Sequence, residues 1–106
     1  MVKVRWQSTA KEDLRAICHY YRHVKLSLVT VTKIKEAMFA AARGLEMFPE
    51  QGAIENCLQQ TGICYRYLVV RKHYKLIYFY ELNICHIVAI WDCRNNPQLL
   101  QDKIEK

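Results

Sequence analysis

Two apolar segments in the second half of the chain, KLIYFYEL (75–82) and ICHIVAIWDC (84–93), constrain the fold most strongly. Both are rich in β-branched and aromatic residues, which favour strands. The turn around Asn83 is too short for a crossover, so these two strands must run antiparallel. A similar segment, CYRYLVVRK (64–72), precedes them and is separated from the first by His73-Tyr74. The sequence therefore predicts a three-stranded antiparallel meander.

Two helices are predicted before this meander. The first has apolar side chains at helical spacing, namely Leu14, Ile17, Cys18 and Tyr21. Thr9 and Glu12 fit a capping box at its start, because a hydroxyl and a carboxylate three residues apart can satisfy unpaired backbone N–H groups. The second helix opens near Ser27, and Pro49 and Gly52 end it. It has one apolar stripe, formed by Val31, Ile34, Met38, Ala41, Leu45 and Phe48.

The two ends of the chain complete the predicted fold. The segment VKVRW (2–6) alternates apolar and basic residues, as in a strand with one buried face. In the tail, Asn96 is suited to cap a short helix whose first residue is Pro97. We therefore predict a single α+β domain over residues 1–106. It has an N-terminal strand, an antiparallel two-helix hairpin packed on a small antiparallel β-sheet, and a short C-terminal helix.

The period of two places alternate residues of a strand on opposite faces of the sheet. One face carries Lys75, Ile77 and Phe79, and the other carries Leu76, Tyr78 and Tyr80. Periodicity alone leaves open which set meets the helices.

Positive charge is concentrated in the predicted meander. The chain has 16 Lys and Arg against 10 Asp and Glu, a net charge of +6, and no acid between Asn56 and Tyr80. Either a polyanionic partner or ordinary solubility charge accounts for this excess. Cations interleaved with planar rings suit phosphate contacts and base stacking. The candidate binding residues are Arg66, Arg71, Lys72, His73 and Tyr74.

Other classes of function are disfavoured by composition. No apolar run approaches the ~20 residues of a membrane span, and charge near the start of the chain argues against a secretory signal. Five cysteines then indicate reduced thiols of a cytoplasmic protein. Cys85-His86 with Cys93 lacks the short ligand pairs of a zinc site, and three glycines cannot form a phosphate-binding loop. We expect no metal, no cofactor and no membrane association.

Nearly the whole chain resembles the RelE/ParE superfamily of type II toxin–antitoxin (plasmid stabilisation) toxins. The resemblance rests on the strand ending in Trp6, on AKEDLRAICHYY, on FPEQG, and on the order of YRYLVVRKHYKLIYFY and IVAIWDCRNNP. It implies a growth-inhibiting protein with the fold predicted above. It also implies a cognate antitoxin as partner, which we expect to be acidic and partly disordered. A homodimer and a toxin–antitoxin hetero-oligomer are both compatible with it.

The superfamily has two branches, and the resemblance assigns residues differently in each. In the RelE/YoeB-like branch, a ribosome-dependent and metal-independent mRNA endoribonuclease, the matching catalytic positions are Glu55, Lys75 and Arg94. Such nucleases have His or Tyr just beyond the arginine, whereas this chain has Asn95 and Asn96. The sequence therefore favours the ParE-like branch, which inhibits DNA gyrase, with the mRNA endoribonuclease as the alternative. A non-toxic, small basic RNA-binding domain is a further alternative.

Overall fold

The structure is a computed structural model that describes residues 1–105, and within them it contains three α-helices, one 3-10 helix and five strands. The elements are β1 (Lys3–Trp6), α1 (Ser8–His23), α2 (Leu28–Gly44), β2 (Ala53–Ile54), the 3-10 helix η1 (Asn56–Thr61), β3 (Arg66–Val70), β4 (Tyr74–Glu81), β5 (Ile84–Asp92) and α3 (Pro97–Glu105). This order confirms the predicted α+β architecture. No helix in the described part of the chain is long and apolar enough to cross a membrane.

The strands form one sheet in the order β1-β5-β4-β3-β2. The predicted meander is β3–β4–β5, and both of its pairings are antiparallel. β1 lies parallel to β5, so the sheet is mixed rather than purely antiparallel. A short turn forces two consecutive strands to pair antiparallel. Residues 7–83 lie between β1 and β5, so no short turn constrains this pair, and the sequence could not show whether it is parallel or antiparallel.

The two turns of the meander use left-handed backbone conformations. Leu82 and Asn83 have φ of 53° and 64°, which is the geometry of a tight two-residue hairpin turn. Between β3 and β4 the turn consists of residues 71–73 instead of the predicted His73-Tyr74, and Tyr74 is the first residue of β4. Arg71 and Lys72 adopt φ of 50° and 69° there. The predicted turn was placed two residues too late because Gly, Asn and Asp are the residues that usually adopt a left-handed conformation, and Arg71 and Lys72 are not among them.

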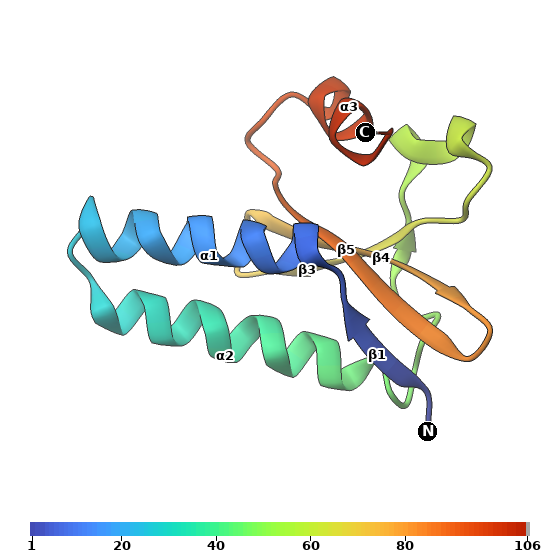
Figure 1. Cartoon of the computed structure of the whole chain (residues 1–106), viewed down its shortest axis with the longest axis horizontal. Helices are drawn as coiled ribbons and strands as arrows, with labels where there is room; N and C mark the ends of the chain where they lie inside the picture. Colours follow the sequence, from blue (N-terminus) through green and yellow to red (C-terminus); the bar gives the residue numbers. More distant parts are fainter. Residues whose placement is uncertain (106) are drawn as a thin grey trace.

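The two sheet faces are covered by different elements, which settles the open question about β4. Leu76 and Tyr78 are fully buried, and Tyr80 is partly buried, in a core shared with α1 and α2. Ile77 and Phe79 lie on the opposite face, in a second core with Leu58 of η1 and Leu100 of α3. In Figure 1, α1 and α2 run side by side along the sheet, and α3 and η1 lie together away from them. Lys75 therefore emerges on the face opposite the helix hairpin.

The predicted capping box at α1 is wrong. The helix begins at Ser8, and its N-cap residue Gln7 makes no side-chain capping hydrogen bond. Thr9 lies inside the first turn and donates its hydroxyl proton to the carbonyl oxygen of Val88 over 2.6 Å. The threonine therefore fixes the helix to β5, which is a long-range contact that a local motif cannot reveal.

The predictions for the other helix ends were partly right. Ser27 caps α2 by accepting from the backbone N–H of Thr30, and the side chain of Asn96 accepts from the backbone N–H of Gln98 at the start of α3. However, α2 ends at Gly44, several residues before Pro49. Leu45 remains fully buried, whereas Phe48 is 66% exposed and does not continue the apolar stripe. The apolar pattern continues past the end of α2 because Leu45, in the turn after the helix, is still buried in the core, so the pattern predicted a helix that is too long.

Candidate functional site

Glu55 and Lys75 meet on the sheet face opposite the helix hairpin. The Lys75 ammonium donates to Glu55 Oε2 over 2.7 Å, and the two side chains are 25% and 5% exposed. The ammonium also lies 4.2 Å from the centroid of the Tyr67 ring, a cation–π contact. Burial lowers the pKa of Lys75, but the hydrogen bond to Glu55 and the charge interactions, chiefly with Glu55, together outweigh it, so the pKa of Lys75 is raised. The two residues therefore form a charged and largely enclosed pair.

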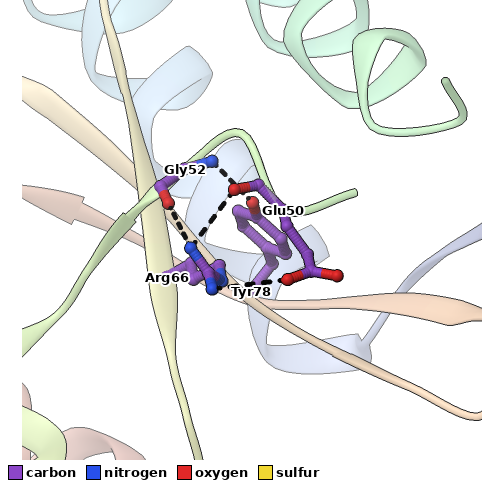
Figure 2. Close-up of polar contacts among 4 residues, drawn as sticks. All are labelled: Glu50, Gly52, Arg66 and Tyr78. Atoms are coloured by element: carbon purple, nitrogen blue, oxygen red, sulfur yellow. Dashed lines mark hydrogen bonds and ion pairs between the residues drawn. The ribbon is translucent and has the colours of Figure 1, made fainter. Parts of the chain in front are cut away.

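Arg66, at the start of β3, holds the turn that carries the FPEQG sequence, and its ladder partner Tyr78 belongs to the core shared with α1 and α2. Its Nη1 donates to the carbonyl oxygen of Gly52 over 2.8 Å and to that of Glu50 over 3.2 Å. Its Nη2 is 3.7 Å from Glu50 Oε2, an exposed ion pair. Figure 2 shows the guanidinium directed at this turn, where the Gly52 N–H also donates to the Tyr78 hydroxyl over 2.9 Å. The contacts of Arg66 are therefore those of a structural residue.

Arg94 is engaged by its own neighbour. Its Nε and Nη2 donate to the two carboxylate oxygens of Asp92 over 2.9 and 2.7 Å. This fork lowers the pKa of Asp92 and raises the pKa of Arg94. Asp92 pairs with Tyr74 in the β-ladder, and burial together with a hydrogen bond to Tyr21 raises the pKa of Tyr74. These four side chains line a cavity of about 500 Å³ beside α1.

The β3–β4 turn presents the remaining candidate binding residues in different environments. Arg71 and Lys72 are exposed, and His73 is partly exposed. Tyr74 is only 4% exposed and points into the core with α1. Of the five candidate binding residues, Arg71 and Lys72 are the two that project freely into solvent.

The structure brings some candidate catalytic residues together and separates another. Glu55 and Lys75 are in contact on the face opposite the helix hairpin. Arg94 lies on the helix side of the sheet, where it lines the cavity beside α1 together with Tyr21, Tyr74 and Asp92. To cleave a phosphodiester, the general acid, the general base and the stabilising cations of the enzyme must all lie within hydrogen-bond distance of the same phosphate group. Two groups on opposite faces of a sheet do not meet this requirement.

Three residues that shape these sites were not identified from the sequence. Asp92 is the partner of Arg94, and its position two residues before the arginine was the available signal. Tyr21 and Tyr78 were read as apolar helix and strand residues, yet their hydroxyl groups bond to Tyr74 and to the Gly52 backbone. The sequence gives no signal for these long-range partners, because they depend on tertiary packing.

Asp13 is a further polar residue that links elements. It accepts from the backbone N–H of Ile90 over 2.9 Å and from Lys103 Nζ over 2.7 Å, so it ties α1 to β5 and α3. Among the residues whose placement is described, no group of three or more His, Cys, Asp or Glu side chains could hold a metal ion.

A protein-family model and a solved structure are both similar to this chain. The family model described as the ParE toxin of the type II toxin–antitoxin system, parDE, matches residues 4–97. A solved structure from the chromosomal ParDE TA system of P. aeruginosa is similar, with a TM-score of 0.70 at 20% sequence identity. The similarity covers 87% of this chain and 96% of that one. A search of curated proteins gave no match.

Proposed function

Since this chain belongs to the ParE toxin family of type II toxin–antitoxin systems, we propose that it arrests growth by inhibiting DNA gyrase and is neutralised by a cognate antitoxin. In this proposal the toxin binds its target and does not cut nucleic acid. Gyrase acts in the cytoplasm, so the toxin would act there as well.

The observation that carries this proposal is the separation of the candidate catalytic side chains. Glu55 is bonded to Lys75 on one face of the sheet, and Arg94 is bonded to Asp92 on the other. Beyond the arginine, Asn95 donates its backbone N–H to the Asp92 carbonyl oxygen and Asn96 caps α3, so neither supplies a general acid. This arrangement favours binding over phosphodiester cleavage.

The exposed cations of the β3–β4 turn are suited to target binding. Arg71 and Lys72 project from a turn whose backbone is held on both sides by paired strands. Positive side chains on a rigid support accelerate encounter with an acidic protein surface. We include His73 in this target-facing region. Arg66 would support target binding indirectly, because it holds the FPEQG turn at the other end of β3.

The second candidate function is a metal-independent mRNA endoribonuclease acting on the ribosome. The Glu55–Lys75 pair favours it, because a largely buried carboxylate 2.7 Å from an ammonium is an arrangement used in proton transfer. In that case Glu55 would take the 2′-hydroxyl proton and Lys75 would stabilise the phosphate charge.

A double substitution separates the two candidates in cells. Glu55→Gln with Lys75→Met removes both charges and keeps side-chain volume, so the fold should persist, which circular dichroism of the purified variant checks. If the toxin inhibits gyrase, brief induction of either form causes filamentation and a DNA-damage response while primer extension finds intact messages. If it is a nuclease, the native chain produces cut messages and the double variant does not.

A further inference from the structure

A polar pocket lies where the β3–β4 turn meets α1 and α2. It has a volume of about 450 Å³, and the buried residues Ile34 and Tyr74, which are 1% and 4% exposed, form its floor. Arg71, Lys72 and His73 line it from the turn. We call this cavity the turn pocket. Its floor belongs to the core shared with α1 and α2, so the pocket lies on the helix side of the sheet.

The turn pocket carries positive charge that no carboxylate in its lining balances. Among the residues that the structure describes, no acid lines the pocket, and neither Arg71 nor Lys72 takes part in an ion pair. Asp92, the ladder partner of Tyr74, is a nearby acid, but both of its carboxylate oxygens accept from Arg94. Cations that are held together without a counter-charge favour the binding of an anion.

The backbone of the turn holds these cations in place. Arg71 and Lys72 have φ of 50° and 69°, a left-handed conformation that costs free energy in any residue with a side chain. The His73 N–H donates to the Arg71 carbonyl oxygen over 2.8 Å, and the His73 carbonyl oxygen accepts from the Cys93 N–H over 2.6 Å. These bonds and the paired strands on both sides maintain the turn. The cations therefore stand on a fixed support, which lowers the entropic cost of binding a ligand.

Two hydroxyl groups on the helices add hydrogen-bond donors to the lining. Thr30 Oγ1 accepts from Ser27 Oγ over 2.8 Å, and the Tyr21 hydroxyl accepts from the Tyr74 hydroxyl. A hydroxyl keeps one proton to donate in addition to the bonds that it accepts. Within the described part of the chain, no acceptor takes the proton of Thr30 or of Tyr21. Both protons are therefore available to a ligand in the pocket.

We propose that the turn pocket binds a phosphate group, either as free phosphate or as the phosphate of a nucleotide. A phosphate has several oxygens in a tetrahedral arrangement, so it can accept from the turn, α1 and α2 at the same time. A carboxylate has two oxygens, and a single arginine can bind both, as Arg94 does with Asp92. The volume of about 450 Å³ is larger than a phosphate ion and leaves room for the sugar of a nucleotide. The inference goes beyond the proposed function, which needs only the exposed charge of this turn.

The chain offers a matched control for each of two substitutions. Lys72→Gln removes a cation that lines the pocket, whereas Lys33→Gln removes an exposed cation of α2 that does not line it. Thr30→Val removes a hydroxyl that lines the pocket, whereas Thr32→Val removes one that donates to the Leu28 carbonyl oxygen and does not line it. The members of each pair differ in position and not in the chemical change.

Isothermal titration calorimetry of the full chain, at an ionic strength held constant with chloride, measures the binding of inorganic phosphate and of adenosine 5′-monophosphate. We expect Lys72→Gln to raise both dissociation constants at least about tenfold and Thr30→Val to raise them about threefold or more, because each removes a hydrogen bond to a charged group. Lys33→Gln and Thr32→Val should change them less than about twofold. Tighter binding of the nucleotide assigns the pocket to a phosphate ester, and equal binding assigns it to free phosphate.

A second measurement uses the native chain and depends on no substitution. Amide chemical shifts recorded by NMR during a phosphate titration should change most at residues 71–73 and at Thr30. The assignment is overturned if neither phosphate ligand binds, if the largest shifts lie elsewhere, or if Lys72→Gln weakens binding no more than Lys33→Gln does. Acetate that binds as tightly as phosphate would also overturn it, because the turn would then be a general anion surface. These results are independent of gyrase inhibition, since the titrations contain no target.

Discussion

Gly52 occupies a site with no space for a side chain, and Gly52→Ala tests the packing on which the Glu55 and Arg66 region depends. A β-carbon there would lie 2.7 Å from the Tyr78 hydroxyl and 2.8 Å from the Tyr67 carbonyl oxygen. Neither group can withdraw easily, because Tyr78 is fully buried and the carbonyl belongs to β3. Overpacking of this kind costs about 1–3 kcal/mol. Displacing the Tyr78 hydroxyl from the Gly52 N–H leaves buried polar groups unsatisfied, which costs about 1–3 kcal/mol more.

We therefore expect Gly52→Ala to lower the free energy of unfolding by at least about 2 kcal/mol. For a domain of this size, that lowers the melting temperature by about 10 °C or more. Gly44→Ala is the control, since its β-carbon would meet only the flexible Gln51 side chain at 3.3 Å in the last turn of α2. It should be neutral or stabilising by up to about 1 kcal/mol. Thermal and urea unfolding followed by circular dichroism measure both. Equal stability of Gly52→Ala and the native chain would refute the packing argument.

Three further substitutions test individual contacts. Lys75→Met should destabilise by about 1.5–3 kcal/mol in urea unfolding, because Glu55 keeps its charge but loses the ammonium, and adding Glu55→Gln should restore most of the loss. Arg94→Gln should destabilise at about pH 7 but not at about pH 2.5. The pKa of Asp92 is lower in the folded protein than its value of about 3.9 in the unfolded chain, so ionised Asp92 stabilises the fold above about pH 3.9. This stabilisation is lost as the pH falls through the pKa of Asp92 in the folded protein. Equal destabilisation by Arg94→Gln at both pH values would contradict this account. Asn96→Ala removes the cap of α3 and should cost about 1 kcal/mol, with faster amide exchange in α3 but not in α2.

The elements were predictable where a local pattern and the tertiary structure agree. The meander followed from strand composition and from Asn83, which adopts the left-handed conformation that a two-residue turn requires. Ser27 and Asn96 cap helices as expected, because capping is a contact within three residues. Thr9 shows the limit of such motifs, since its hydroxyl bonds instead to the Val88 carbonyl oxygen 79 positions away.

The arrangement of the site was less predictable than its residues. Motif positions grouped Glu55, Lys75 and Arg94, but strand alternation and the local pairing of Arg94 with Asp92 place the arginine on the other face of the sheet.

The supercoiling activity of purified DNA gyrase in the presence of this toxin tests the central claim most directly. The account predicts a dose-dependent loss of plasmid supercoiling that antitoxin reverses. It also predicts that the Glu55→Gln, Lys75→Met double variant inhibits as strongly as the native chain. Full supercoiling at a large molar excess of folded toxin, together with cleaved messages in induced cells, would contradict it.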